Sequence, residues 1–224
     1  MQSRLIVIEG VDASGKETQA RCLYERLRAQ REDVFSVRFP NYESESSALV
    51  KMYLRGDFGE RAEDVNAYTA SVFFAADRAA SVLGQWRKEF FGGGVVIADR
   101  YTPSNLIHQA SKIKGQNERD AFLDWSCELE YEKMGLPKPD LVIFLDMPPE
   151  YARQLMAGRE NKIDHSQSKD IHERDASHLQ SAYDSAVYVA KRSGWKTVHC
   201  VKDGKIRTVE EIADEVYASV SALL

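Results

Sequence analysis

The stretch that decides the fold is IEGVDASGKETQ, residues 8–19. Gly10 is followed by four residues and then by Gly15 and Lys16, which is the spacing of a phosphate-binding loop. A strand-like run, RLIVIE (4–9), precedes the loop, and a stretch with helical periodicity follows it. We therefore expect backbone N–H groups of the loop to surround a β-phosphate and Lys16 to reach the β- and γ-phosphates of a nucleotide.

The residue after Lys16 departs from the usual pattern. A Ser or Thr hydroxyl normally holds magnesium there, whereas this chain has Glu17, with Thr18 beside it. A carboxylate next to a phosphate costs roughly 4 kcal/mol per pair of unit charges at about 4 Å, unless a metal ion lies between them. Two interpretations stay open: Glu17 ligates magnesium directly or through water, or it faces solvent at the start of a helix. A nucleotide-binding regulatory protein that has lost catalysis is an alternative function.

Short apolar runs alternate with amphipathic stretches along the whole chain. A run that is apolar on both faces is typical of a parallel sheet covered by helices, and the predicted strands are 4–9, 33–39, 94–99, 141–146 and 196–201. Helical spacing of apolar residues follows the loop at 20–27 and recurs at 209–220. The expected fold class is α/β, a three-layer α/β/α domain with a five-stranded parallel sheet and right-handed crossovers. We expect one domain over residues 1–224, in which the polar segment 158–170 is a solvated loop or a mobile lid.

Composition limits the classes of function. The formal net charge of -5 argues against a general nucleic-acid or membrane-surface binder. Cys22, Cys127 and Cys200 are far apart and form no CxxC pair, so neither a disulfide framework nor a zinc site is indicated. No apolar run approaches the ~20 residues that span a bilayer, and the chain starts directly on a strand-like run. We expect a cytoplasmic protein.

A second phosphate site is indicated where the run VVIAD ends. Asp99 follows the apolar run and Arg100 comes next, so a carboxylate and a guanidinium lie at the carboxyl edge of the sheet, where ligands of such sheets bind. Asp146 ends its run in the same way, but no arginine follows it. Phe74 and Arg78 share one helix face and suit a base and its phosphate. The alternatives are a structural ion pair at Asp99–Arg100, and a buried Phe74 with a surface Arg78.

Several segments together resemble one family. EGVDASGK, RFP (38–40), FFAADR (73–78), DRYTPSNLIHQ (99–109) and LPKPDLVIFLDMPPE (136–150) are similar, in order and spacing, to thymidylate kinases. The resemblance covers about residues 4–160. It implies the P-loop kinase fold, transfer of the γ-phosphoryl of ATP to dTMP with Mg²⁺ to give dTDP and ADP for dTTP biosynthesis, and a homodimer. A kinase for another nucleotide or a deoxynucleoside is the alternative within the same class.

The resemblance also implies roles for individual residues. Asp12 would hold the sugar 3′-hydroxyl, Phe74 would stack on thymine, and the base edge would meet Arg78 with Asn105 or Gln109. Arg100 would bind the acceptor phosphate, Asp99 would order metal and phosphates, and His108 lies where the family often has an aromatic residue near the sugar. Asn105 and Gln109 could instead be exposed helix positions. The implied dTMP-binding set is Asp12, Phe39, Phe74, Arg78, Arg100, Ser104, Asn105, His108 and Gln109. The implied ATP-binding set is Gly10, Val11, Asp12, Ala13, Ser14, Gly15, Lys16, Glu17 and Thr18.

Two departures from the family pattern concern positive charge. The loop has no basic residue at Ala13 or Ser14, and family members without one place an arginine in the lid instead, for which Arg159 is the candidate, with Arg153 the neighbouring choice. An arginine commonly follows RFP two residues later, where this chain has Tyr42. The expected catalytic set is Lys16, Asp99, Arg100 and Arg159, and the expected metal ligands are Glu17 and Asp99.

Overall fold

The computed structural model describes residues 2–156 and 176–224 of the chain. Its centre is a five-stranded sheet in which every neighbouring pair is parallel and the strand order is β2-β3-β1-β4-β5. The strands are β1 (Arg4–Glu9), β2 (Val34–Arg38), β3 (Val95–Asp99), β4 (Leu141–Asp146) and β5 (Lys196–His199). The predicted five-stranded parallel sheet is therefore confirmed, with strand ends within two residues of the expected ones. The predicted lid at 158–170, with Arg159, lies outside the described residues.

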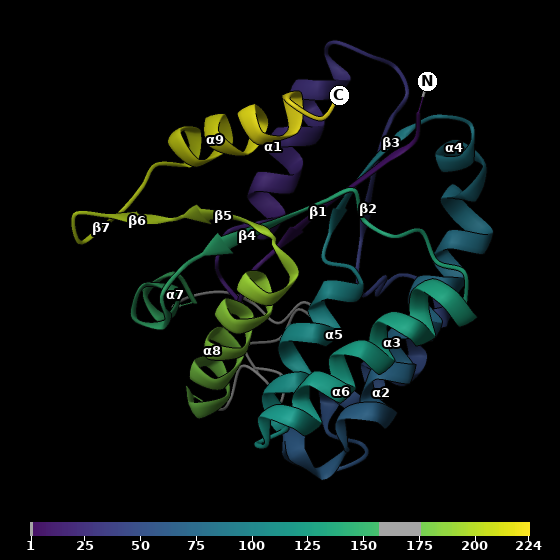
Figure 1. Ribbon diagram of the computed structural model, residues 1–224, viewed down its shortest axis with the longest axis vertical. Coiled ribbons are helices and arrows are strands. Elements are labelled where there is room, and N and C mark those ends of the chain that lie inside the picture. Colours follow the sequence, from purple (N-terminus) through teal and green to yellow (C-terminus); the bar gives the residue numbers. More distant parts are fainter. Residues whose placement is uncertain (1, 157–175) are drawn as a thin grey trace.

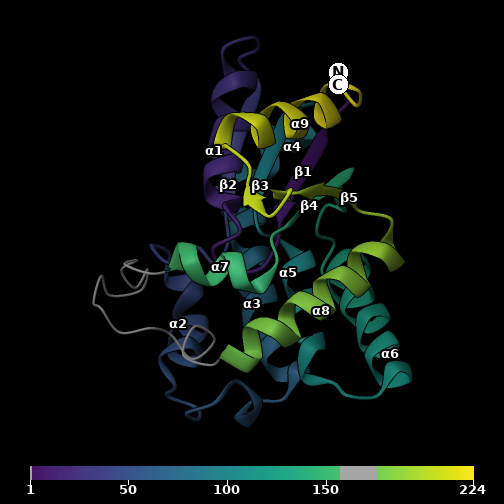
Figure 2. The ribbon, with the colours of Figure 1, turned by 90° about the vertical axis from the view of Figure 1, so that its left-hand side faces the viewer.

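Helices cover both faces of the sheet (Figures 1 and 2). In Figure 1, α1 and α9 lie over one face, while α3, α5, α6 and α8 lie over the other, which is the expected three-layer arrangement. The described helices are α1 (Lys16–Arg28), α2 (Ala48–Arg55), α3 (Ala67–Ser81), α4 (Arg87–Phe91), α5 (Thr102–His108), α6 (Gln116–Cys127), α7 (Pro149–Met156), α8 (Ala176–Ser193) and α9 (Val209–Ser221). Two π-helical segments, Val82–Trp86 and Glu128–Lys133, extend α3 and α6.

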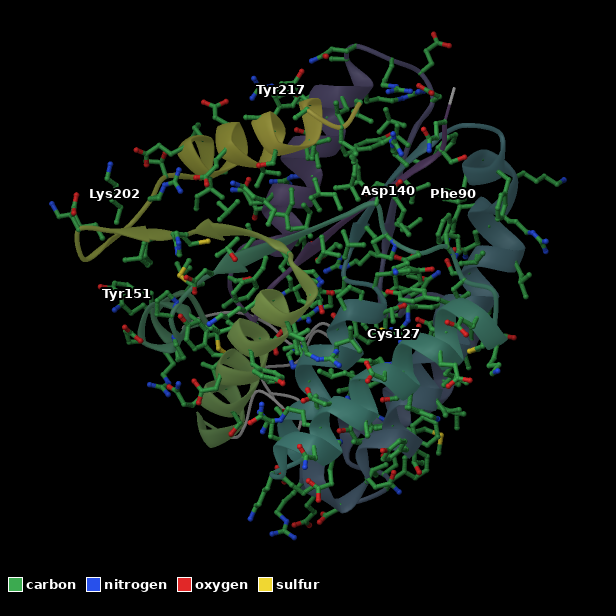
Figure 3. The ribbon with its side chains drawn as sticks, viewed as in Figure 1. Phe90, Cys127, Asp140, Tyr151, Lys202 and Tyr217 are labelled. Carbon is green, nitrogen blue, oxygen red and sulfur yellow. The ribbon has the colours of Figure 1, made fainter. Side chains whose placement is uncertain are left out.

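The central strand shows why this sequence makes a covered sheet. Leu5 and Val7 of β1 pack into one apolar cluster and Ile6 and Ile8 into another, and all four are fully buried. At roughly 1.5–3 kcal/mol for each large apolar side chain removed from water, these contacts stabilise both layers at once. Asp140, labelled in Figure 3, fixes the start of the sheet, because its carboxylate accepts a 2.8 Å hydrogen bond from the Leu5 amide.

The small hairpin after β5 was not predicted. After β5 the chain forms an antiparallel hairpin of β6 (Val201–Lys202) and β7 (Lys205–Ile206), which projects from one end of the molecule (Figure 1). Two-residue strands are too short to show a period-2 pattern, so the sequence carries no signal for them beyond the Asp203–Gly204 turn. The hairpin continues into α9, which returns along α1.

Candidate active site

The loop between β1 and α1 has the backbone shape that a phosphate site needs. Gly10 and Gly15 have φ angles of 157° and 90°, which residues with a Cβ rarely adopt. A Cβ on Gly10 would also lie 2.9 Å from the carbonyl oxygen of Leu145, so the neighbouring strand excludes a side chain there. Gly15 is the N-cap residue of α1, and the loop therefore presents the start of that helix to a ligand.

Lys16 lies inside this loop and not on the surface. Its Nζ donates a 2.7 Å hydrogen bond to the carbonyl oxygen of Val11, across the loop, and the residue is buried. Burial and the nearby positive charge of Arg100 lower the pKa of Lys16 to about 7, against the opposing effect of Asp12, Asp99 and Glu9. The amino group of Lys16 is thus held at the centre of the loop. A bound phosphate would favour its protonated, positively charged form.

We expect ATP binding to add a proton to Lys16. At pH 8 a lysine with a pKa of about 7 is mostly neutral, whereas phosphate oxygens favour the ammonium form and so raise that pKa. Calorimetric titration with ATP at pH 8 in two buffers of different ionisation enthalpy should show uptake of close to one proton, because the triphosphate itself is already deprotonated. A Lys16→Met variant should show no uptake. An equal uptake in that variant would contradict the assignment.

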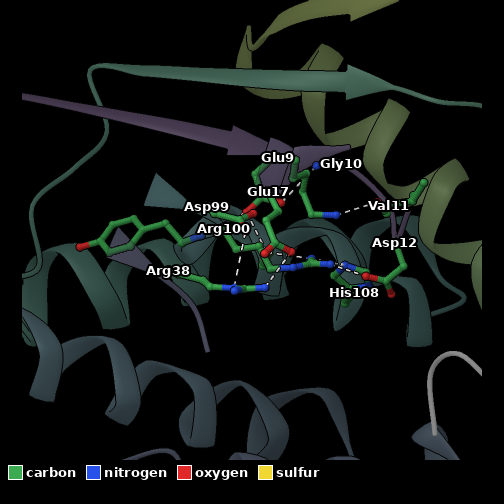
Figure 4. Close-up of polar contacts among 12 residues, drawn as sticks. Glu9, Gly10, Val11, Asp12, Glu17, Arg38, Asp99, Arg100 and His108 are labelled. Carbon is green, nitrogen blue, oxygen red and sulfur yellow. Dashed lines mark hydrogen bonds and ion pairs between the residues drawn. The ribbon is translucent and has the colours of Figure 1, made fainter. Parts of the chain in front are cut away.

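The Glu17 side chain is 57% exposed to solvent and has an arginine among its partners. Its carboxylate accepts a 2.9 Å hydrogen bond from Nη2 of Arg38, and Nε of Arg38 lies 3.8 Å from Oδ2 of Asp99 (Figure 4). The three residues come from the first turn of α1, the end of β2 and the end of β3. Neither interpretation of Glu17 from the sequence included this ion pair, because residues 17 and 38 share no sequence pattern. Whether Glu17 also ligates magnesium stays a prediction.

Arg100 joins the phosphate loop to a second pocket. Its Nη2 contacts Oδ1 of Asp12 in the loop, and its Nη1 lies 3.0 Å from Nε2 of His108 and 3.4 Å from Oγ of Ser104 (Figure 4). Burial lowers the pKa of Arg100, but the carboxylates of Asp12, Glu9 and Asp99 outweigh it and keep the guanidinium charged. Asp99 and Arg100 therefore have different partners, and the alternative that they form one structural ion pair is wrong.

Glu9 fixes the backbone around Arg100. Arg100 has a positive φ of 68°, a conformation that is uncommon for a residue with a side chain. The fully buried carboxylate of Glu9 accepts hydrogen bonds from the Tyr101 amide (3.1 Å) and from Oγ of Ser104 (2.7 Å), immediately after that turn. Burial raises the pKa of Glu9, and the charge of Arg100 opposes the rise. Glu9 thus ties the end of β1 to the start of α5 and positions Arg100.

The second pocket adjoins the loop at the carboxyl edge of the sheet. All nine residues of the predicted dTMP-binding set line it, and they come from four separate stretches of the chain. Its lining is Asp12, Phe39, Pro40, Tyr42, Leu54, Phe74, Arg78, Arg100, Ser104, Asn105, His108 and Gln109. The alternatives that placed Arg78 on the surface and Asn105 and Gln109 at exposed positions are wrong, since all three are buried. The structure brings the predicted residues together, and their contacts with a nucleotide stay a prediction.

A buried carboxylate organises the inner wall of this pocket. Glu130 accepts two hydrogen bonds from Arg78, at 2.6 and 2.7 Å, one from Oγ1 of Thr102 at 2.8 Å and one from Nδ2 of Asn105 at 3.0 Å. Burial lowers the pKa of Arg78, but its attraction to Glu130 outweighs this and raises it, so the guanidinium stays charged. Within the described part of the chain, the Oε1 atom of Gln109 is buried without a hydrogen-bond partner. An acceptor of this kind suits an N–H group of a bound base.

Sequence reasoning missed the residues that support the site from behind. Asp77 accepts hydrogen bonds from the Asn41 amide (2.8 Å) and from Ser46 (2.6 Å), and so holds the loop that brings Pro40 and Tyr42 to the pocket. Glu9 and Glu130 act in the same indirect way on Arg100 and Arg78. A buried acid at a strand end or in a helix was the available signal, but the spacing within one segment does not show which distant group it meets.

Asp146, the alternative to Asp99, is hydrogen-bonded to Tyr183 and lies 2.7 Å from Nδ1 of His199.

A parallel sheet with a phosphate loop after its first strand, next to a second pocket that shares an arginine with the loop, defines a P-loop kinase of small phosphorylated substrates. The family model described as thymidylate kinase matches residues 8–210. The chain therefore belongs to the thymidylate kinase family, a family of phosphotransferases that bind ATP.

Individual relatives agree with this assignment. A thymidylate kinase of Mycobacterium tuberculosis is 35% identical over 196 residues, which cover 85% of this chain and 87% of the relative. The Caenorhabditis elegans thymidylate kinase is 29% identical over 226 residues, or 96% of this chain and 90% of its own length. The human thymidylate kinase is 35% identical over 144 residues, which cover 64% of this chain and 60% of the human protein. None of the described helices combines the length and apolarity required to cross a membrane.

Proposed function

We propose that this protein transfers the γ-phosphoryl group of ATP to dTMP, giving dTDP and ADP in the synthesis of dTTP. The observation that carries the proposal is the single pocket lined by all nine residues of the predicted dTMP-binding set, next to the phosphate loop. Family membership supports the same reaction. Arg100 contacts Asp12 of the loop and also lines the pocket, so the two phosphate-binding parts meet at one guanidinium.

The reaction needs positioning and positive charge more than proton transfer. The second pKa of a phosphate monoester is about 6, so an oxygen of the acceptor phosphate is already an anionic nucleophile at neutral pH and needs no general base. Lys16 would bind the β- and γ-phosphates from inside the loop, while Arg100 would hold the acceptor phosphate in line with them. Their charges stabilise the negative charge that spreads over the transferring group. Arg159, predicted as a lid arginine, would add a further charge.

Thymine recognition follows from the pocket's inner wall. The ring of Phe74 would stack on the base, and Arg78, Asn105 and Gln109 would meet its polar edge. Because Nε and Nη2 of Arg78 donate to Glu130 within the described part of the chain, Nη1 remains for a carbonyl oxygen of the base. The unpartnered Oε1 of Gln109 would accept from the base N–H. His108 would lie near the sugar, where Asp12 would take the 3′-hydroxyl.

The site has an oxygen that fits Mg²⁺. Within the described residues, Oδ1 of Asp99 is buried and has no hydrogen-bond partner, and a carboxylate oxygen is the ligand that magnesium takes. Magnesium typically keeps several waters and binds through one or two carboxylates plus substrate phosphates, which agrees with the finding that no cluster of three or more metal-binding side chains occurs in the described ranges. When bound, the ion would neutralise charge on the phosphates of ATP. Asp99 would hold it, and Glu17, whose Oε2 accepts from Arg38, would be the second carboxylate.

We further propose that the chain is one domain with a lid, acts in the cytoplasm and pairs with a second copy. Free thiols at Cys22, Cys127 and Cys200 suit a reducing compartment. On α3, Val72 is 47% exposed, one helical turn after Tyr68, whose ring centroid lies 4.6 Å from that of Trp125, and Leu83 in the π-helical segment that extends α3 is 65% exposed. An apolar surface of this kind is typical of an interface between subunits. Sedimentation at micromolar concentration should therefore give twice the mass of one chain.

The reaction is tested with a panel of acceptors. With ATP and magnesium, kcat/KM for dTMP should exceed that for CMP, AMP and GMP, and thymidine should not be phosphorylated. The margin over dUMP should be small, because a missing methyl group in an apolar pocket is worth only about 1–3 kcal/mol. If AMP or a nucleoside is the best acceptor, the protein is a kinase of another substrate. ATP binding without transfer to any acceptor would instead indicate a regulatory nucleotide-binding protein.

A further inference from the structure

Arg38 lies between the two phosphate-binding parts of the site, although no role follows for it from the reaction described above. It is the last residue of β2 and stands opposite Asp99 in the parallel register with β3. The next two residues, Phe39 and Pro40, already line the acceptor pocket. On its other side, the first turn of α1 carries Glu17. The position therefore places a guanidinium at the carboxyl edge of the sheet, where the two nucleotides would meet.

The contacts of Arg38 hold its guanidinium in place but involve only some of its N–H donors. Nη2 donates to Glu17 at 2.9 Å, and Nε lies 3.8 Å from Oδ2 of Asp99 (Figure 4). Within the described part of the chain these contacts occupy Nε and Nη2, so Nη1 remains for a ligand. The Arg38 side chain is 44% exposed, and a bound phosphate could reach it without displacing protein. An arginine fork can donate to a carboxylate and a phosphate together, because its five N–H groups point in fixed directions.

The distribution of charge in the site favours a role for Arg38 as a phosphate-binding cation. Two positions where members of the family that the chain resembles often carry a basic residue, Ala13–Ser14 in the loop and Tyr42 after RFP, carry none in this chain. The first turn of α1, directly after the loop, instead carries a negative charge, Glu17. Exposed ion pairs contribute little to stability, so the Glu17–Arg38 pair has little value as a stabilising contact alone. It does neutralise Glu17, and it holds a cation at the edge where two are missing.

We propose that Arg38 binds the phosphate of the acceptor nucleotide and that Glu17 is the positioning residue that orients its guanidinium. The proposal rests on the proposed function in that it names a further residue of the same acceptor site. Nη1 of Arg38 donates to a phosphate oxygen, while Nη2 keeps its contact with Glu17. The carboxylate at position 17 is then part of the acceptor site through Arg38, which gives it a role that does not require it to touch the metal.

The test separates the phosphate from the rest of the ligand. Binding of dTMP and of thymidine is measured by calorimetry for the wild type and for Arg38→Ala and Arg38→Lys. Because a hydrogen bond to a charged group is involved, Arg38→Ala should weaken dTMP binding about 10- to 100-fold and leave thymidine binding within about twofold. The affinity of Arg38→Lys for dTMP should lie between those of the wild type and Arg38→Ala. Arg26→Ala is the matched control, since Arg26 is 45% exposed and pairs with Asp214 away from the site.

A second pair of variants tests the positioning role. Glu17→Gln should raise KM for dTMP several-fold in the wild-type background and should have no further effect on dTMP binding in the Arg38→Ala background. Equal loss of dTMP and thymidine affinity in Arg38→Ala, or no loss of either, would overturn the phosphate contact. An equal effect of Glu17→Gln in both backgrounds would overturn the positioning role. If the wild type prefers another monophosphate, that nucleotide and its nucleoside replace the ligand pair, so failure of the proposed substrate is seen separately from failure of the Arg38 contact.

Discussion

Replacing Lys16 by methionine should lower kcat for phosphoryl transfer about 100- to 1000-fold, with little change in the melting temperature. Lys16 is the buried cation at the centre of the phosphate loop, held by the Val11 carbonyl, and loss of one preorganised group that stabilises transition-state charge has effects of this size. Methionine keeps the length and apolar body of the side chain, so the loop should keep its shape. Steady-state rates with saturating ATP and dTMP give kcat, and thermal unfolding reports on the fold.

The matched control for this change is Lys202→Met. Lys202 lies in the β6–β7 hairpin, which projects from one end of the molecule (Figure 3), and it belongs neither to the phosphate loop nor to the lining of the acceptor pocket. That variant should keep the wild-type kcat. A Lys16→Met protein that turns over at more than a tenth of the wild-type rate would show that the loop lysine does not stabilise the transferring group, and the charge would then have to come from Arg100 and residues outside the described ranges.

Replacing Glu130 by alanine should lower the free energy of unfolding by about 3–5 kcal/mol. The change removes one partner of a fully buried ion pair and leaves the Arg78 guanidinium without its carboxylate, which is far more costly than loss of an exposed pair. Thr102 and Asn105 lose an acceptor at the same time. Urea denaturation followed by circular dichroism measures the loss.

A double variant separates stability from recognition. In Arg78→Met/Glu130→Leu both charges are gone, and apolar side chains of similar size replace a buried ion pair at little or no cost. We expect most of the stability lost in Glu130→Ala to return, while dTMP binding stays weak because the pocket has lost Arg78. If the double variant binds dTMP as the wild type does, Arg78 has no part in recognition of the base. A loss below 1 kcal/mol in Glu130→Ala would show that the buried pair is not tightly coupled.

Local patterns in the sequence were enough to predict the sheet and the phosphate loop. The strands are short, largely apolar runs of four to six residues, and the phosphate loop has fixed spacing, so both are visible without knowledge of the fold. The resemblance to a family supplied the nine pocket residues. Whether a residue on a helix is buried is a different matter. Arg78 looks like a surface residue by its chemistry, and only the partner 52 positions away, Glu130, makes its burial possible.

The supporting contacts could not be predicted for the same reason. Glu9 meets Ser104, Asp77 meets Ser46, and Glu17 meets Arg38, each across a separation that no periodicity links. Which acid meets which base depends on strand order and register, and the order β2-β3-β1-β4-β5 becomes known only when the sheet is assembled. Glu17 is the clearest case, because both interpretations from the sequence considered only metal and solvent as its surroundings.

The packing of α9 along α1 has a consequence for how the C-terminal end of this chain can be altered. The family model ends at residue 210, one turn or less into α9, yet α9 reaches the helix that begins with Lys16. The Val209 carbonyl accepts a 3.1 Å hydrogen bond from Gln19, and the guanidinium of Arg26 lies 3.7 Å from the centre of the Tyr217 ring. A protein shortened to the family boundary would keep every residue proposed to touch a nucleotide, but α1 would lose the layer that supports it. Shortening the chain at this end, or adding a tag that displaces α9, should therefore weaken ATP binding more than it weakens binding of the acceptor nucleotide.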